Sequence, residues 1–274
     1  MGKKVFVIDV GICNGCYTCQ FMCKDEHAGN DWTPIAKPQP EVGQFWCKLV
    51  EDIQGTVPQV KMSYRPHICM HCDNAPCMKA CKVKGAKYKR PDGLVIINPE
   101  LCTGCRNCVD ACPYEAIYFN EDLNISQKCT GCAHLLDNGW TEPRCADACP
   151  NLAIKLLDED DKATQALIAK AEVWKPELKN KVKPRVYYLN VPKKFVAGTV
   201  YDPVKEEVYI GAECVLTGSG DKKFKVKTND FGDFWFKDLP DGKYKLEIKA
   251  GSKTKVIDKI DISSNSAGLG DIAM

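Results

Sequence analysis

The chain has 274 residues, of which 45% are hydrophobic, so it can bury one large core or the cores of two ordinary domains. Its 38 lysines and arginines nearly balance its 36 aspartates and glutamates, and a formal charge of +2 gives no reason to expect nucleic-acid binding. No apolar run approaches the roughly 18 residues of a membrane-spanning helix, so no direct membrane span is expected.

The first ten residues contain a short apolar run, which predicts a first β-strand. They contain neither a twin arginine nor a small-residue cleavage site, so the sequence does not predict a signal peptide. We therefore expect a cytoplasmic protein made in a reducing compartment. Export in complex with a partner that carries a signal is the less favoured alternative.

Four cysteine motifs occupy the first half of the chain. The first and third have the spacing C-x2-C-x2-C-x3-C, which is typical of bacterial ferredoxins, where three thiolates bind one [4Fe–4S] cluster and the fourth binds another. Gly15 and Gly104 lie inside these two loops, where the backbone must turn sharply. The cysteines of the two motifs are Cys13, Cys16, Cys19 and Cys23, and Cys102, Cys105, Cys108 and Cys112.

The second and fourth motifs keep the two outer spacings but lengthen the middle loop, which a surface loop tolerates at small entropic cost. Zinc sites use two C-x2-C pairs and have no use for a fourth cysteine at x3, and closely spaced cysteines cannot conveniently form disulfides with one another. We therefore predict sixteen ligands for four [4Fe–4S] clusters. The remaining eight are Cys69, Cys72, Cys77 and Cys81, and Cys129, Cys132, Cys145 and Cys149.

Two cysteines and four histidines fall outside this pattern. Cys47 and Cys214 have no partner at ligand spacing and are expected to be small buried residues of strands. The histidines lie near the motifs, where local hydrogen bonding is a better expectation than metal ligation or proton relay: His27, His67, His71 and His134.

Each loaded cluster with four thiolates carries a charge of about −2, so four would contribute roughly −8. Basic residues interleaved with the cysteines would suit such a negative region, although a solvated basic face is an equally good interpretation. They are Lys24, Lys79, Lys82, Lys84, Arg106, Lys128 and Arg144.

The order of elements around the third motif is that of a ferredoxin half: a hairpin with an Asp92-Gly93 turn, the cluster loop, a helix and a return strand. Residues 1–157 are therefore predicted to form a four-cluster, tandem ferredoxin-like domain with insertions at 24–68 and 133–144. Residues 158–194 are expected to form a helix over 158–171 and then an extended linker. Within that linker the run 185–189 could lie against a partner or form a simple surface strand.

From residue 195 onward, short alternating strands are separated by glycine and aspartate turns, which predicts a small antiparallel β-sandwich over 195–274. The fold class is thus α+β. The strands are expected at 196–201, 208–216, 224–228, 234–236, 244–248 and 256–262. The expected core residues are Val215, Phe234, Phe236, Leu239, Tyr244, Leu246 and Ile248.

The four-motif half resembles the iron–sulfur subunits of the dimethyl sulfoxide reductase family of molybdopterin enzymes. The stretches 64–66, 69–77 and 128–137, and Asp25-Glu26-His27 with Trp32, are similar to the small subunits of pyrogallol–phloroglucinol transhydroxylases, which also carry a C-terminal β-sandwich. In those small subunits, however, the third motif is degraded and three clusters are held, whereas the third motif is complete here. A complete row of clusters suits net electron delivery, which favours a related hydroxylase or dehydroxylase as the enzyme that this chain serves.

The resemblance implies that the first motif pairs with the fourth and the second with the third. The implied ligand sets are Cys13, Cys16, Cys19 with Cys149; Cys129, Cys132, Cys145 with Cys23; Cys69, Cys72, Cys77 with Cys112; and Cys102, Cys105, Cys108 with Cys81. By the same analogy, the first of these clusters lies nearest the pterin.

The resemblance also implies the function. The chain would be a non-catalytic electron-transfer subunit in a heterodimer with a large molybdopterin subunit, whose molybdenum or tungsten acts on polyhydroxylated aromatics, and an external electron donor or acceptor is a further possible partner. The alternative is a generic polyferredoxin-type subunit of a hydrogenase or quinone-linked reductase. A stand-alone enzyme is disfavoured, because the sequence contains no Rossmann fingerprint, P-loop or triad pattern.

Overall fold

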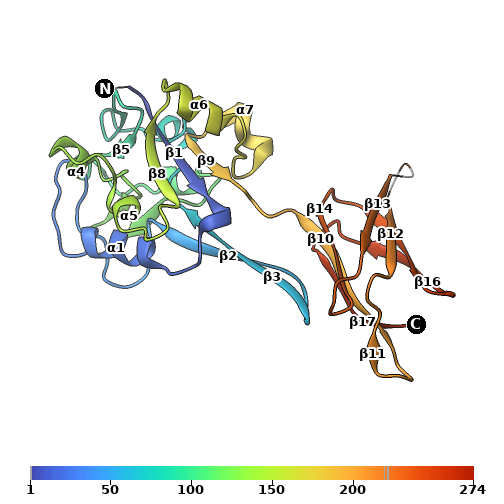
Figure 1. The fold of residues 1–274 in the computed structure, drawn as a ribbon. Coiled ribbons are helices and arrows are strands. Elements are labelled where there is room, and N and C mark those ends of the chain that lie inside the picture. Colours follow the sequence, from blue (N-terminus) through green and yellow to red (C-terminus); the bar gives the residue numbers. More distant parts are fainter. Residues whose placement is uncertain (1, 219, 221) are drawn as a thin grey trace. The chain divides into compact units, whose positions relative to one another are not determined.

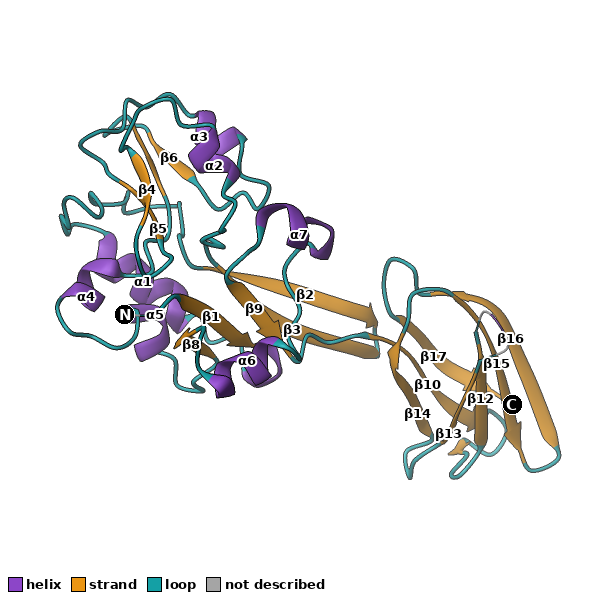
Figure 2. Cartoon of the chain, turned by 90° about the horizontal axis from the view of Figure 1, so that it is seen from above, coloured by secondary structure: helices purple, strands orange, loops and turns teal. Residues whose placement is uncertain are grey.

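The computed structural model describes residues 2–218, 220 and 222–274 and divides the chain into two compact units. The first unit comprises the residues up to Glu51 together with Ser63–Val191, and the second comprises Asp52–Met62 together with Pro192–Met274 (Figure 1). In the described residues, α-helices occur only in the first unit, while the second is built mainly of strands (Figure 2). This confirms the α+β class.

A three-stranded sheet lies in the core of the first unit, in the order β8-β1-β9. The central strand β1 (Lys4–Asp9) pairs antiparallel with β8 (Ile154–Asp158) and parallel with β9 (Val186–Leu189). Four consecutive residues of β1 are buried, from Val5 to Ile8, because both faces of this strand are covered. The predicted first strand is thereby confirmed.

The cysteine motifs lie on short helices and hairpins of the same unit. Helix α1 is close to α5, and α2 is close to α3, so the first motif meets the fourth and the second meets the third. The Asp92-Gly93 turn joins β4 and β5 as predicted, with Gly93 at a φ of 86°. The elements are η1 (Val10–Ile12), α1 (Thr18–His27), α2 (Pro76–Lys79), β4 (Lys87–Lys89), β5 (Val95–Ile97), α3 (Asn107–Asp110), β6 (Tyr118–Asn120), β7 (Ile125–Gln127), α4 (Ala133–Asp137) and α5 (Arg144–Asp147).

Residues 158–191 differ from the predicted extended linker. Helix α6 (Lys162–Ile168) forms inside the predicted range, and Asp161 caps it by accepting a hydrogen bond from the Ala163 N–H at 3.1 Å. After η2 (Pro176–Leu178) and α7 (Lys179–Val182), however, strand β9 enters the sheet beside β1. This segment is therefore packed into the first unit, because Val186 and Tyr188 are buried in its core.

The second unit contains two four-stranded sheets. One has the order β11-β10-β14 with β17 also paired to β10, and the other has the order β13-β12-β15-β16. The strands are β10 (Lys194–Asp202), β11 (Glu207–Val208), β12 (Glu213–Thr217), β13 (Lys223–Lys227), β14 (Asp233–Leu239), β15 (Lys243–Ala250), β16 (Lys253–Asp261) and β17 (Ala267–Ala273). The predicted small sandwich is confirmed, with additional parallel pairing of β17 against β10.

Three details of the predicted sandwich were wrong. Val215 is only partly buried, and its neighbours Cys214 and Leu216 point into the core, because side chains alternate between the faces of a strand. The predicted strand 208–216 is divided into β11 and β12, and β17 was not predicted at all. The other six predicted core residues are buried.

A long hairpin arises in the insertion at 24–68 and consists of β2 (Lys48–Thr56) and β3 (Gln59–His67). Its tip, Asp52–Met62, belongs to the second unit. There Thr56 Oγ1 donates to Gly268 O at 2.9 Å, and the Gly270 N–H donates to Gln59 Oε1 at 3.0 Å. The second unit is thus completed by residues far earlier in the chain.

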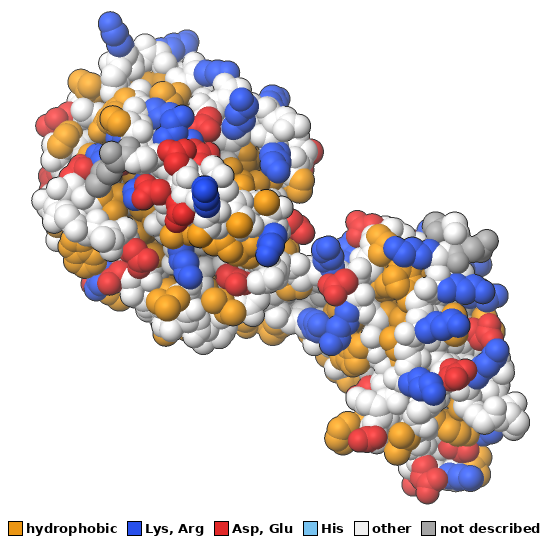
Figure 3. Space-filling model, turned by 45° about the horizontal axis from the view of Figure 1, so that its top comes forward, with side chains coloured by type: hydrophobic (Ala, Val, Ile, Leu, Met, Phe, Trp, Pro, Cys, Tyr) orange, Lys and Arg blue, Asp and Glu red, His pale blue; other side chains and the backbone are white. Residues whose placement is uncertain are grey.

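The surface carries both signs of charge. Figure 3 shows lysine or arginine and aspartate or glutamate side chains interspersed over the visible face of each unit, as the near-zero formal charge suggests. Among the described helices, none has the length and apolar character needed to cross a membrane.

Candidate iron–sulfur sites

The loop of each cysteine motif contains a left-handed residue between its first two cysteines. Gly15, Gly104 and Gly131 take this position with φ values of 73°, 71° and 65°. A Cβ on Gly104 would lie 2.5 Å from the backbone oxygen of Asn124, so a side chain there would clash. In the second motif the equivalent residue is His71, with a φ of 42°.

The third cysteine of each motif lies in a helical turn, and the fourth follows four residues later. In the first motif, for example, Cys19 and Cys23 both lie on α1. Residues four apart on a helix have Cβ atoms about 5–6 Å apart, which is far enough to serve two neighbouring sites.

The structure brings the cysteines together in the four sets that the resemblance implied. Three sets line one cavity each, and we name them site I (Cys13, Cys16, Cys19 and Cys149), site III (Cys69, Cys72, Cys77 and Cys112) and site IV (Cys81, Cys102, Cys105 and Cys108). Site II contains the fully buried Cys23, whose pKa is raised by burial first and then by the charges of the other three members, Cys129, Cys132 and Cys145.

The four sites form a row. Sites I and II are neighbours because Cys19 of site I and Cys23 of site II lie one turn apart on α1. Lys128 directly precedes Cys129 of site II and donates to the carbonyl of Val95, which lines site III, so sites II and III are neighbours too. Cys77 of site III and Cys81 of site IV are four residues apart at α2, and Cys108 of site IV and Cys112 of site III are four residues apart at α3, so sites III and IV are neighbours as well. The sequence of sites is therefore I, II, III and IV.

Cys47 lies at the junction of sites I and II, although sequence reasoning assigned it no partner. Hydrogen bonds with Cys145 and Cys19, followed by burial, raise its pKa. Cys47 and Cys214 are both buried, as predicted. Cys214 lies on strand β12, whereas Cys47 precedes the start of β2 by one residue, so the strand prediction was wrong for Cys47.

Every site has a backbone N–H directed at one of its sulfurs. The N–H groups of His71 and Ser126 lie 3.5 Å from the Sγ atoms of Cys69 and Cys102. The corresponding contacts in sites II and I are Gly131 N to Cys129 Sγ at 3.4 Å and Ala153 N to Cys149 Sγ at 3.3 Å. Hydrogen bonds to sulfur are one of the means by which a protein sets a cluster's potential.

Several buried polar groups that line sites III and IV have no partner within the described part of the chain. In site III they are His71 Nε2 and Tyr114 Oη, and in site IV they are Lys87 Nζ and Ser126 Oγ. All four can act as donors. For His71 the Nδ1 atom accepts from the Val95 N–H at 3.0 Å, and burial above all lowers the pKa of the ring, so the proton belongs on Nε2.

Buried donors without acceptors are costly, so these groups call for an acceptor-rich group in the cavities. Thiolates and inorganic sulfides are such acceptors, and the residues present therefore fit an iron–sulfur cluster. No group of three or more cysteine, histidine, aspartate or glutamate side chains in the described residues could hold a single metal ion.

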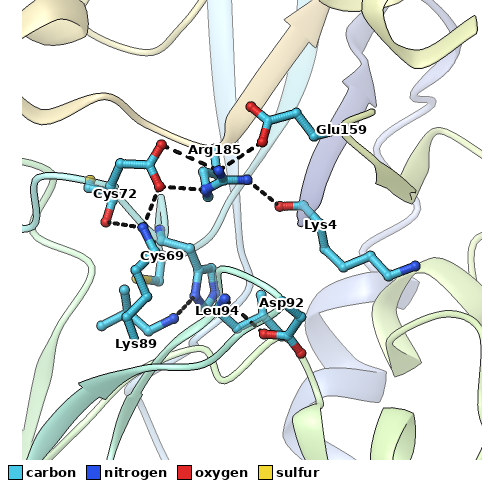
Figure 4. Close-up of polar contacts among 11 residues, drawn as sticks. Lys4, Cys69, Cys72, Lys89, Asp92, Leu94, Glu159 and Arg185 are labelled. Carbon is cyan, nitrogen blue, oxygen red and sulfur yellow. Dashed lines mark hydrogen bonds and ion pairs between the residues drawn. The ribbon is translucent and has the colours of Figure 1, made fainter. Parts of the chain in front are cut away.

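Ion pairs hold the second motif against the central sheet (Figure 4). The Arg185 guanidinium, which is 2% exposed, donates to Asp73 at 2.7 Å, to Glu159 at 2.9 Å and to the Lys4 carbonyl at 3.0 Å. Burial would raise the pKa of the Asp73 carboxyl, but the hydrogen bonds from Arg185 and Lys89 outweigh it and lower that pKa. The segment after α7 thereby fixes the loop that carries Cys69 and Cys72.

All four histidines make local polar contacts, as the hydrogen-bonding interpretation expects. Besides His71, His67 Nε2 contacts Tyr114 O at 2.9 Å, and His134 Nε2 contacts Glu26 Oε1 at 2.9 Å. His27 Nε2 lies 3.9 Å from the sulfur of Cys132 in site II. The rings of His27 and His134 also meet edge to face, with centroids 5.3 Å apart.

The sequence did not reveal that Tyr114 and Lys87 line cysteine sites. Nor did it reveal that Cys47 lies between two of the sites. The motif spacing could have indicated His71, because this residue occupies the position that glycine holds in the other three loops. No local signal marks Lys87 or Tyr114, since their role depends on which loops meet in space.

Taken together, the paired motifs, the row of cysteine sites and the ferredoxin-like elements define an iron–sulfur protein. A family model for a 4Fe–4S dicluster domain matches residues 60–159.

Comparison with known proteins identifies more closely which iron–sulfur proteins the chain is similar to. The pyrogallol hydroxytransferase small subunit of Pelobacter acidigallici is 39% identical and aligns over 100% of both chains. The arsenate respiratory reductase iron–sulfur subunit of Shewanella sp. strain ANA-3 is 32% identical over 71% of this chain and 98% of its own. A tetrathionate reductase subunit of Salmonella typhimurium is 33% identical over 71% of this chain and 75% of its own.

The chain belongs to the iron–sulfur electron-transfer subunits of the molybdopterin oxidoreductases, the dimethyl sulfoxide reductase family. The resemblance derived from the cysteine motifs is thus confirmed.

Proposed function

We propose that this chain carries four [4Fe–4S] clusters, one in each of sites I to IV, and passes electrons between them and a large molybdopterin subunit. The sixteen cysteines of these sites are the proposed ligands. The observation that carries the proposal is the unbroken row of four complete cysteine sets, each adjacent to the next. A row of this kind would conduct electrons stepwise from site I to site IV.

The residues of this chain would bind the clusters and adjust their electronic properties. Each bound cluster supplies one-electron redox chemistry. The cysteine thiolates hold the iron, and the backbone N–H groups at Cys69, Cys102, Cys129 and Cys149 stabilise negative charge on sulfur. His71 and Tyr114 add donors at site III. Core side chains such as Met70 and Ile117 surround this site and exclude water.

We further propose that the partner acts on polyhydroxylated aromatic compounds. This is supported by the full-length similarity to the pyrogallol hydroxytransferase small subunit, whereas the arsenate and tetrathionate reductase subunits align with only 71% of this chain. The complete third motif favours net electron delivery, as in a hydroxylase or dehydroxylase, over an internally balanced transhydroxylation. The bond-making chemistry would belong to the partner's molybdenum or tungsten pterin, with no active site in this chain and with the complex in the cytoplasm.

Iron and acid-labile sulfide analysis tests the number of clusters. About sixteen irons per chain are expected, and about twelve would mean that one site is empty. Cys105→Ser should remove one cluster and leave about twelve irons, since Cys105 belongs only to site IV. Cys214→Ser, a change at a buried cysteine of the second unit, is the matched control and should retain about sixteen.

Purification under anoxic conditions tests the partner. We expect a large subunit that contains molybdenum or tungsten pterin to co-purify, and the complex to reduce or hydroxylate polyhydroxylated aromatics. A stable monomer without a pterin partner would rule the proposal out. Co-purification with a hydrogenase or a quinone-linked module would instead support the generic polyferredoxin alternative.

A further inference from the structure

Two lysines are buried beside the row of cysteine sites. Lys87 on β4 is 8% exposed, and Lys128, directly before Cys129, is 2% exposed. The described part of the chain gives the Lys87 ammonium no hydrogen-bond partner. The Lys128 ammonium donates to two backbone carbonyls, those of Val95 and Cys129, and the second distance is 2.9 Å. None of these hydrogen bonds involves a carboxylate.

Each lysine lies between two sites. Lys87 lines the cavity of site IV together with Cys81 and Cys108, and its charge also lowers the pKa of Cys77 in site III, against the larger effect of burial. Lys128 directly precedes Cys129 of site II, and its ammonium donates to the carbonyl of Val95, which lines the cavity of site III. Lys87 therefore marks the junction of sites III and IV, and Lys128 marks the junction of sites II and III.

A buried ammonium without a counter-charge is strongly unfavourable, so its retention at both junctions requires a nearby anion. A cluster with four thiolates carries about −2, and reduction by one electron makes it about −3. A fixed cation between two clusters therefore interacts more favourably with the reduced form of each. In a low-dielectric interior this interaction is much stronger than it would be in water.

We propose that Lys87 and Lys128 are built-in cations that stabilise the reduced state of the clusters on either side, so that sites II, III and IV accept electrons more readily. Reduction then needs only the incoming electron, because the positive charge is already in place and no proton is taken up. This inference rests on the proposed occupancy of all four sites. Site I adjoins neither lysine, and the neutral thiol of Cys47 takes the equivalent place between sites I and II.

The test is a redox titration of the cluster-loaded protein, followed by electron paramagnetic resonance, for Lys87→Met and Lys128→Met. Each variant should lower the reduction equilibrium constants of two of the four clusters by about tenfold or more. One cluster, that of site III, should be affected by both changes. In the double variant, the reduction potentials of the clusters in sites II, III and IV should shift, whereas that of site I should not. Lys84→Met removes the same charge from the exposed loop between Cys81 and β4 and should shift none.

The charge-retaining variants Lys87→Arg and Lys128→Arg separate charge from packing. If they keep the native potentials while the methionine variants shift, the proposal stands. Equal shifts for arginine and methionine, or unchanged potentials in the methionine variants with about sixteen irons bound, would overturn it. About twelve irons in the unchanged protein would instead refute the four-cluster function, so the two failures are distinguishable.

Discussion

His71 occupies the loop position that glycine takes in the other three motifs, with its backbone in the left-handed region at a φ of 42°. Such a conformation is uncommon for a residue with a side chain, and it persists where the surroundings impose it. The bond from the Val95 N–H to Nδ1 fixes the ring, and it leaves Nε2 as a buried donor at site III. We infer that the imidazole is retained here for its donor.

The change His71→Gly tests this role. Glycine suits the backbone better, so the protein should still fold and bind about sixteen irons. Loss of a donor to sulfur should lower the reduction potential of one cluster by tens of millivolts, on the order of 1 kcal/mol. Redox titration of the purified variant measures this shift. An unchanged set of potentials would show that Nε2 makes no contact with the site III group.

Asp202 is expected to make the stability of the second unit depend on pH. Its carboxylate accepts hydrogen bonds from Val204 N at 3.0 Å and Tyr209 Oη at 2.9 Å and pairs with Lys253 at 3.2 Å. Together these contacts lower the pKa of Asp202 below its usual range, and the hydrogen bond from the Val204 backbone has the largest effect. A lowered folded-state pKa contributes stability above the unfolded value of about 3.9, and this stability is lost as the pH falls below that value.

We therefore expect Asp202→Asn to be less stable at neutral pH and to lose less further stability on acidification from about pH 5 to pH 3. Hydrogen exchange of peptides from β10 and β15 measures the stability of the second unit at each pH without relying on the clusters. Asp258→Asn is the matched control, because Asp258 is exposed and forms an exposed ion pair with Lys245. Equal acid sensitivity of the two variants would contradict the assignment.

Among the elements, β9 shows why the segment after residue 158 was misread. Three prolines and many lysines indicated a linker. The four residues of β9 carry no local signal that they pair in parallel with β1. Parallel partners are distant in sequence, so local pattern does not determine them. β17 was missed for a related reason, since its glycines weaken the strand pattern while its parallel pairing with β10 supplies the stability.

Arg185 allows the packing of this segment to be tested. Arg185→Met leaves the carboxylates of Asp73 and Glu159 without their buried partner, although both are partly exposed and Lys89 remains beside Asp73. We expect a loss of about 2 kcal/mol from the free energy of unfolding of the first unit. Guanidinium unfolding followed through cluster absorbance measures it. Lys245→Met, which breaks an exposed pair, should change stability by less than about 0.5 kcal/mol.

At the scale of the whole molecule, each unit is built from two separate stretches of the chain. The tip of the β2–β3 hairpin belongs to the second unit, although more than a hundred residues separate it from β10. A Cβ on Gly268 would lie 2.6 Å from the backbone oxygen of Thr56, so the hairpin approaches β17 too closely for any side chain at that position. The second unit is therefore not formed by a single continuous stretch.

Gly268→Ala should force the hairpin tip away from β17 and destabilise the second unit by about 1–3 kcal/mol. Limited proteolysis should then cleave within residues 52–62 faster than in the unchanged chain. Asn265→Ala removes the hydrogen bonds that Asn265 Oδ1 accepts from Gly55 N at 3.3 Å and from Ser266 N at 2.8 Å, but it creates no clash and should have a smaller effect. Similar cleavage rates in the glycine variant and the unchanged chain would contradict this packing.

The sequence by itself determined the number and type of cysteine motifs, the α+β class and the presence of a sandwich. These follow from local spacing and alternation, which encode how a loop can wrap a cluster and which face of a strand is buried. The family followed from the same motifs.

Only the tertiary structure decided the burial of Lys87 and Lys128, the location of Cys47 between two sites, the role of β9 and the contribution of the hairpin tip. Each depends on segments distant in sequence meeting in space, and the resulting exclusion of water gives an ordinary lysine or thiol its electrostatic effect.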